Sequence, residues 1–305
     1  MNQLPATMHV LERGWLSSNN LVFCGQHETA VLDTGYVTHA PQTLALVQQV
    51  LQGRALDRVL NTHLHSDHCG GNASLQAHYA CRTTIPFAER DAVFHWNQDA
   101  LSFRATGQQC PQFSFTDTLQ PGDYLTLGEL EWQALAAPGH DPHSLVFYCA
   151  EEKILISADA LWEHGFGVIF PELDDQSGFA EARASIDWMA KLDVRLVIPG
   201  HGPMFAGFAA ALERAWARLD FFEAEPLRHA QYAIKVLLKF LLLEHQRIAL
   251  ASLPQMMTDL WVVNRANQRF FQQTPQQLAD ATVAQLVRAG AARVEDGWLV
   301  NCGTF

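Results

Sequence analysis

Histidine and aspartate gather in a short segment near residue 65 of this 305-residue chain. His63 and His65 are two positions apart, so on an extended strand both imidazoles face the same side. Asp67 and His68 follow where the chain must turn, and Gly70-Gly71 supply a permissive backbone for that turn. Imidazole nitrogen and carboxylate oxygen suit zinc, and iron or manganese accept the same ligand types. The segment therefore predicts a metal site.

Three more candidate ligands occur later, and each directly follows a segment with strand character. They are His140, Asp159 and His201. Loops at the ends of strands can bring side chains together on a rigid base. Seven candidates are too many for one tetrahedral ion, but they suit two ions that share a bridging carboxylate and leave positions for water. Two ions about 3.5–4 Å apart can lower the pKa of a bridging water and polarise a substrate oxygen.

The elements that must position these ligands alternate between strands and helices. Residues 20–34 read as a hairpin around a polar turn. A helix is expected from Pro41 to Gly53, because proline favours a first turn and glycine a helix end. A short strand over 57–62 leads into His63, and a helix over about 178–191 precedes the strand that ends at His201. This order of elements agrees with an α/β fold.

Four motifs resemble the metallo-β-lactamase superfamily in order and approximate spacing. They are HLHSDH at 63–68, PGH at 138–140, SADA around Asp159 and PGHGP at 199–203, within a match over about residues 18–205. The resemblance implies a four-layer αββα sandwich with two divalent ions, expected to be zinc, at one edge of its sheets. It implies that one ion is held by His63, His65 and His140, the other by Asp67, His68 and His201, with Asp159 bridging. Asp33, in VLDTG, matches an aspartate that supports the site from behind the ligands.

Ligand identity also separates branches of this superfamily. Its oxygen-reducing di-iron members typically have glutamate where this chain has His65. Its antibiotic-hydrolysing members often use cysteine for the second metal or lack the bridging aspartate, and most carry a secretory signal. The chain is therefore most similar to the glyoxalase II-like group. That group's PGH commonly continues with Thr and a Gly-Ser pair, whereas Asp141-Pro142-His143-Ser144 follows here, so a glutathione thioester is not assumed.

The resemblance leads us to expect a metal-dependent hydrolase of a small acyl substrate, such as a thioester, lactone or related ester. A metal-bound hydroxide, held and oriented by Asp67, would attack the carbonyl while the metals stabilise the oxyanion. An endoribonuclease of the same superfamily and a mononuclear iron persulfide dioxygenase stay open as alternatives. His143, Trp162 and His164 are candidate pocket residues, and the plainer alternative for each is a loop or core role.

Residues 211–305 are expected to form a second, mainly helical domain after a catalytic domain over 1–210. Long helices are predicted over 207–224 and 228–246, and a further helical piece follows Pro254. Thr274-Pro275 opens a last helix, and a hairpin turns at Asp296-Gly297. Three helices and a hairpin resemble a winged helix. This region has 10 Lys+Arg against 9 Asp+Glu, so nucleic-acid binding is not expected; a lid over the active site or a homodimer contact is preferred.

The composition of the chain limits the classes of protein and of partner that remain. The chain is 49% hydrophobic and 17% charged, which excludes wholesale disorder. It has 20 Lys+Arg against 32 Asp+Glu, a charge of −12 that disfavours nucleic acid as a partner. The start of the chain shows no secretory signal, and six cysteines without a CxxC pair suit reduced thiols, so a cytoplasmic protein acting on a small molecule is expected. The apolar run over 233–243 is interrupted by two lysines, so no membrane span is expected.

Overall fold

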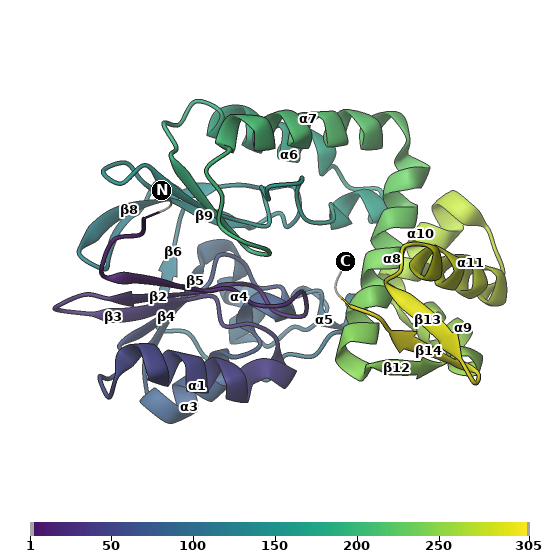
Figure 1. Ribbon diagram of the computed structural model, residues 1–305, viewed down its shortest axis with the longest axis horizontal. Coiled ribbons are helices and arrows are strands. Elements are labelled where there is room, and N and C mark those ends of the chain that lie inside the picture. The colour runs from purple at the N-terminus through teal and green to yellow at the C-terminus, as the bar shows by residue number, and fades with distance from the viewer. Residues whose placement is uncertain (1–2, 304–305) are drawn as a thin grey trace.

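The computed structural model describes residues 3–303, and two β-sheets lie face to face at its centre (Figure 1). The first sheet has six strands in sequence order: β1 (Met8–Leu11), β2 (Asn20–Cys24), β3 (Thr29–Leu32), β4 (Arg58–Leu60), β5 (Arg82–Pro86) and β6 (Asp117–Leu119). The second has five strands in the order β11-β10-β9-β8-β7: β7 (Tyr124–Leu127), β8 (Leu130–Ala136), β9 (Leu145–Cys149), β10 (Ile154–Ala158) and β11 (Leu196–Pro199).

Helices cover the outer face of each sheet and complete four layers. The longer helices on the first sheet are α1 (Ala40–Leu51) and α3 (Asn72–Tyr79), and those on the second are α6 (Phe179–Met189) and α7 (Phe208–Ala224) (Figure 1). Shorter helices are α2 (Ser66–Cys69), α4 (Arg90–Phe94) and α5 (Phe103–Thr106), and 3₁₀ turns cover Val37–His39, Phe87–Glu89, Phe170–Asp174 and Leu250–Ser252. The predicted αββα sandwich is confirmed.

Apolar side chains from both sheets fill the space between them. Phe23, Trp132 and Phe147 are among the largest fully buried side chains there. The inner strands β9 and β10 read LVFYC and ILISA, nearly continuous apolar runs, because one face meets the other sheet and the opposite face meets helices. The hairpin predicted over 20–34 is present as β2 and β3, and the helix predicted from Pro41 is present as α1.

Strand direction brings the candidate ligands to one edge of the sandwich. In the second sheet, β8 and β10 are each antiparallel to β9, and β10 is parallel to β11. The three strands β8, β10 and β11 therefore point the same way, and their carboxyl ends deliver His140, Asp159 and His201 to the same edge. In the first sheet β3 and β4 are parallel, so Asp33 and His63 follow neighbouring carboxyl ends.

Asn19 joins this edge across the two sheets. It lies in the loop before β2, in the first sheet, and its Nδ2 donates to the carbonyls of Pro199 (2.9 Å) and Gly202 (2.7 Å) beyond β11, in the second. Its backbone N–H also donates to the Gly200 carbonyl at 2.7 Å. The side chain is buried, so these bonds hold the ligand-bearing loop after β11 against the first sheet.

The rest of the chain forms a mainly helical region beside the sandwich (Figure 1). Its elements are α8 (Pro226–His245), β12 (Arg247–Ala249), α9 (Leu253–Asp259), α10 (Trp261–Ala266), a π turn (Asn267–Phe271), α11 (Pro275–Arg288), β13 (Ala292–Glu295) and β14 (Trp298–Asn301). Thr274 and Gln277 form a capping box at the start of α11, and Asp296 and Gly297 have the positive φ values of a tight hairpin turn. These two features confirm the predicted helix start and turn.

Two details of this region were not predicted. The strand β12 pairs with β14 and turns the hairpin into a three-stranded sheet in the order β12-β14-β13. The expected division at residues 210/211 falls inside α7, whose buried face packs with α6 over the second sheet, and a separate apolar cluster begins with α8. Both the division into two domains and the winged-helix assignment stay predictions. Within residues 3–303, no helix has the length and apolar character needed to cross a membrane.

Candidate metal centre

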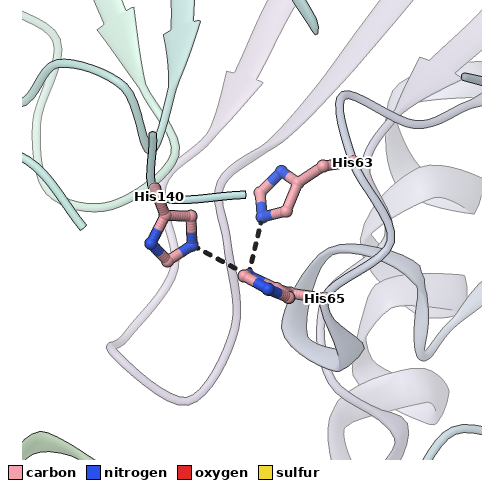
Figure 2. Close-up of side chains that lie close together, drawn as sticks. All are labelled: His63, His65 and His140. Atoms are coloured by element: carbon pink, nitrogen blue, oxygen red, sulfur yellow. Dashed lines mark hydrogen bonds between the residues drawn. The ribbon is translucent and has the colours of Figure 1, made fainter. Parts of the chain in front are cut away.

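Six of the seven predicted ligands converge in two neighbouring clusters. His63, His65 and His140 make the first, and Asp67, His68 and His201 make the second; within each, the candidate ligand atoms lie within 4.8 Å of one another. Figure 2 shows the first cluster, in which His65 Nδ1 lies 3.1 Å from His63 Nε2 and 2.8 Å from His140 Nε2. Three ring nitrogens therefore point toward a common centre.

Asp159 lies between the two clusters. Its Oδ2 is 3.4 Å from His140 Nε2 in the first cluster and 3.7 Å from His201 Nε2 in the second, while its Oδ1 is 3.5 Å from His68 Nε2. The pairing of β10 with β11 shifts register at its end, where Ala158 has a φ of 46°. An irregularity of this kind re-aims the following side chain, so one carboxylate reaches both clusters.

Asp33 and Thr62 determine which nitrogen of His63 and of His68 faces the centre. His68 Nδ1 donates to Asp33 Oδ2 at 2.8 Å, and Thr62 Oγ1 donates to the same oxygen at 2.8 Å. Because the Thr62 hydroxyl hydrogen is used there, Thr62 Oγ1 accepts from His63 Nδ1, 3.0 Å away. Both imidazoles therefore turn Nδ1 to Asp33 and Thr62, and Nε2 is the nitrogen that faces the clusters.

A backbone carbonyl orients His140, and burial keeps the rings of the first cluster neutral. His140 Nδ1 donates to the Val168 carbonyl at 2.5 Å, which leaves the lone pair on Nε2. Burial lowers the pKa of His65 and of His140 to about 4 and that of His63 further below its usual range, so all three rings are neutral near pH 7. Neutral imidazoles with converging nitrogen atoms are a donor set that suits zinc and related ions.

The carboxylates of the centre are ionised. Burial raises the pKa of Asp159, but the nearby imidazoles of His201 and His68 outweigh it and hold that pKa well below the usual range. Burial also raises the pKa of Asp67, but the hydrogen bond from His201 at 3.0 Å, together with the charges of His68 and His201, lowers it below the usual value. His68 Nε2 is buried without a hydrogen-bond partner among the described residues. An unpaired ring nitrogen beside two carboxylates fits a bound divalent cation.

A cavity of about 430 Å³ opens over both clusters. On the sandwich side its walls include Trp15, Trp162 and Phe170, and α8 contributes Tyr232 and Phe240. The C-terminal region thus supplies part of the wall of the site. Mainly apolar walls around a few polar groups are typical of small-molecule sites.

The three predicted pocket residues lie around this centre in different ways. Trp162 lines the cavity, and its Nε1 donates to Asp159 Oδ1 at 3.2 Å. His164 also lines the cavity, with 81% of its side chain exposed. His143 lies in an exposed loop and lines a second, smaller cavity instead.

Several residues of the site were not predicted from the sequence. Trp15 stacks on His201 with ring centres 5.2 Å apart and planes at 2°, and no motif surrounds it. Thr62 could have been found, because it is the last polar residue before His63 at the end of a strand. Tyr232 and Phe240 lie on an apolar helix whose pattern is also satisfied by ordinary core packing, so the sequence gives no signal of their role.

More than half of the chain matches the model of a known protein family. The model of the metallo-beta-lactamase superfamily matches residues 13–201. The chain belongs to this superfamily. The match includes all seven candidate ligands and ends at His201, the last of them.

Curated relatives align with slightly less than half of the chain. A hydroxyacylglutathione hydrolase of Nitrobacter winogradskyi is 33% identical over 132 residues, which cover 43% of this chain and 44% of that protein. A hydroxyacylglutathione hydrolase of Rhodospirillum rubrum is 26% identical over 158 residues, covering 47% of this chain and 54% of the relative. The alignments thus span about half the length of these curated relatives.

Solved structures show the same fold. A metallo-beta-lactamase family protein from Thermus thermophilus matches 99% of this chain and 100% of its own, with a TM-score of 0.59 and 18% identity. The B3 metallo-beta-lactamase BLEG-1 matches 68% of this chain and 96% of its own, with a TM-score of 0.55 and 24% identity. The first of these extends the likeness in fold to the C-terminal region.

Proposed function

We propose that this superfamily member is a metal-dependent hydrolase that cleaves a small acyl substrate, a thioester, lactone or related ester, at a dinuclear centre. The observation that carries the proposal is the position of Asp159, whose two oxygens lie within 3.4–3.7 Å of imidazoles from both clusters. His63, His65 and His140 would hold one divalent ion, and Asp67, His68 and His201 the other, with zinc the expected metal.

Bound there, two divalent ions supply a hydroxide nucleophile near neutral pH and stabilise the oxyanion that forms on the carbonyl. The chain's own groups would orient this chemistry. Asp67 is ionised and lies in the cavity wall, so its carboxylate can accept a hydrogen bond from the attacking oxygen. Trp162 fixes one oxygen of Asp159 by its indole N–H, which leaves the other free to face both clusters.

The cavity supports an acyl substrate. Its walls include many aromatic and aliphatic side chains, and five of the seven candidate ligands line it at the metal centre. A substrate with an apolar acyl part would bury that part against Trp162, Phe170 and α8 and present its carbonyl at the polar end. The curated relatives are named as hydrolases of an acylglutathione, which is a thioester, and this agrees with the proposed reaction class.

Metal analysis and two substitutions test the proposal. We expect about two divalent ions per chain, and a fall of at least about 100-fold in kcat/KM for thioesters or lactones in Asp67→Asn and His140→Ala. His27→Ala, in an exposed turn, is the matched control and should retain activity. Unchanged turnover in both site variants would refute the proposal, and a single iron with oxygen uptake would favour the dioxygenase.

A further inference from the structure

A second cavity adjoins the first on the other side of the His65–His140 pair. It has a volume of about 300 Å³. Four residues line both cavities: His65, Thr106, His140 and Phe170. The two cavities therefore share a boundary at the metal centre.

The titratable residues that line this smaller cavity are mainly acidic. Glu89, Asp99, Asp141 and Asp174 line it, and neither lysine nor arginine does so within residues 3–303. Two of these carboxylates are paired elsewhere, because Asp174 contacts Arg265 at 2.8 Å and Asp99 contacts Arg104 at 3.4 Å. Glu89 and Asp141 are the carboxylates without such a cation in the described part of the chain.

Glu89 is the feature that points to a ligand. Only 5% of the residue is exposed, and its carboxyl group has no hydrogen bond or ion pair within residues 3–303, although it lines the cavity. Burying a carboxylate without a partner is costly. Burial, followed by the charge of Asp141, raises the pKa of Glu89 to about 8, as expected of a carboxyl group that the chain itself gives no counter-charge.

Asp141 is the second carboxylate of the smaller cavity that has no lysine or arginine partner among the described residues. It belongs to the Asp141–Ser144 stretch, in which the sequence departs from the glyoxalase II-like pattern after PGH. Its Oδ1 accepts from the His143 backbone N–H at 2.7 Å, and its Oδ2 lies 3.7 Å from His65 Nε2, beyond hydrogen-bond distance. Its carboxylate therefore retains acceptor capacity toward the cavity.

The arrangement suits an organic ammonium group better than a third metal ion. No group of three metal-binding atoms that includes Glu89 or Asp141 occurs among the residues that the structure describes. The aromatic side chains of Phe170 and Trp261 also line the cavity, and Trp261 is 49% exposed. Aromatic faces attract ammonium groups and offer apolar contact to the carbon chain that carries them.

We propose that the smaller cavity is a substrate subsite that binds an organic ammonium group through the carboxylates of Glu89 and Asp141. The proposal rests on the proposed hydrolase function. The substrate would place its apolar acyl part in the larger cavity and the ammonium-bearing leaving part in the smaller one, with the scissile carbonyl at the metal centre between them.

A binding experiment tests the subsite without relying on turnover. The probes are 2-phenylethylammonium and its neutral analogue 2-phenylethanol, titrated by calorimetry into the purified 305-residue chain. We expect the cation to bind at least about 10-fold more tightly than the alcohol, and Glu89→Gln to weaken only the cation by about 10-fold, because a hydrogen bond to a charged group is lost. Glu213→Gln, on the exposed face of α7, should change neither affinity.

A second variant keeps the test informative if Glu89→Gln fails to fold. Ala100 is exposed and lines the smaller cavity, so Ala100→Lys places a competing cation at its mouth and should also weaken 2-phenylethylammonium binding. Equal affinity for both probes, or cation affinity unchanged in both Glu89→Gln and Ala100→Lys, would overturn the subsite.

Substrate pairs then separate this inference from the proposed function. Two thioesters with the same acyl group, one with a 2-aminoethyl and one with a propyl leaving group, are compared. We expect a kcat/KM at least about 10-fold higher for the aminoethyl thioester and loss of that preference in Glu89→Gln. Hydrolysis of both at equal rates would reject the subsite and keep the hydrolase. Probe binding that depends on Glu89, without hydrolysis of any ester, would keep the subsite and reject the hydrolase.

Discussion

At the scale of single residues, the centre depends on an aspartate that lies behind the ligands. Asp33 follows β3 with a φ of 58°, a left-handed conformation that is uncommon outside glycine. In that position its carboxylate accepts from the Thr62 backbone N–H at 2.9 Å, from the Thr62 hydroxyl and from His68 Nδ1. The left-handed backbone at Asp33 therefore helps to orient His68, although Asp33 is not itself a candidate ligand.

Removing this charge should weaken metal binding while the ligands stay in place. In Asp33→Asn the amide cannot accept all three hydrogen bonds, so we expect affinity for zinc to fall about 10–100-fold. Competition with a chromophoric chelator measures the affinity directly. Asp57→Asn is the matched control, because Asp57 accepts from the Thr29 backbone N–H at 2.8 Å in the same sheet, away from the clusters. Equal zinc affinity in wild type and Asp33→Asn would contradict this prediction.

At the scale of elements, His229 connects three helices. It lies on α8 with 1% of its surface exposed, and its ring packs against Phe179 of α6 at 5.1 Å and Phe222 of α7 at 5.0 Å. Burial, and then the charge of Arg218, lowers its pKa from 6.5 to about 4. The ring is therefore neutral in the folded protein at pH values between about 4 and 6.5, where the unfolded chain is already protonated.

This difference predicts acid sensitivity. As pH falls from about 6.5 to 4, the unfolded chain takes up a proton at residue 229 that the folded chain does not, so stability decreases. Between pH 7 and 4.5 we expect His229 to account for a loss of about 2–3 kcal/mol in the free energy of unfolding. Urea unfolding at both pH values should show a smaller loss of unfolding free energy in His229→Leu than in the wild type. His95→Leu, at an exposed site, should lose as much as the wild type. Equal losses in wild type and His229→Leu would refute this role.

The elements themselves were largely predictable, and the reason is their pattern. The hairpin β2–β3, the helix α1 and the cap at Thr274 each follow from local composition and turn residues. The strand β12 was missed because three residues between a helix and a turn carry too short a pattern. It exists through its pairing with β14, a contact between segments that lie far apart in the sequence.

The site was predictable only in part, for a similar reason. The candidate ligands follow strand ends in motifs that can be read locally, and the structure brings all seven together. The positions of Asp159 and Asp33 depend on backbone irregularities at Ala158 and at Asp33 itself, which no periodicity reveals. The cavity walls depend on how α8 packs against the sandwich, and that is a property of the tertiary structure.

At the scale of the whole molecule, the larger cavity is formed jointly by the sandwich and the C-terminal region. Tyr36, in the loop after β3, donates to Glu244 of α8 at 3.0 Å, and its ring meets Phe240 edge to face at 5.0 Å. Tyr36 Oη also accepts from the Gln109 backbone N–H at 3.1 Å. These contacts hold α8 beside the metal centre.

Filling the wall supplied by α8 should change which acyl groups are accepted. Val236 lines the larger cavity, so Val236→Trp should reduce its volume and lower kcat/KM for an octanoyl thioester by about 10-fold, with a smaller effect on an acetyl thioester. Leu227→Trp, at an exposed position of the same helix, is the control. Equal effects on both chain lengths would show that Val236 does not limit the acyl group.

The sheet edge carries the candidate ligands and α8 lines the cavity, and this arrangement affects how the protein can diverge in evolution. Two glycines beside the candidate ligands leave no room for a side chain, because a Cβ at Gly200 would lie 2.1 Å from Asp159 Oδ1 and one at Gly167 would lie 2.5 Å from His140 Nδ1. Val236 and Tyr232, by contrast, lie on a helix that supplies none of the seven candidate ligands. Mutational drift can therefore alter what enters the site while the reactive centre is inherited intact, and a saturation library restricted to α8 would explore new substrates without losing metal.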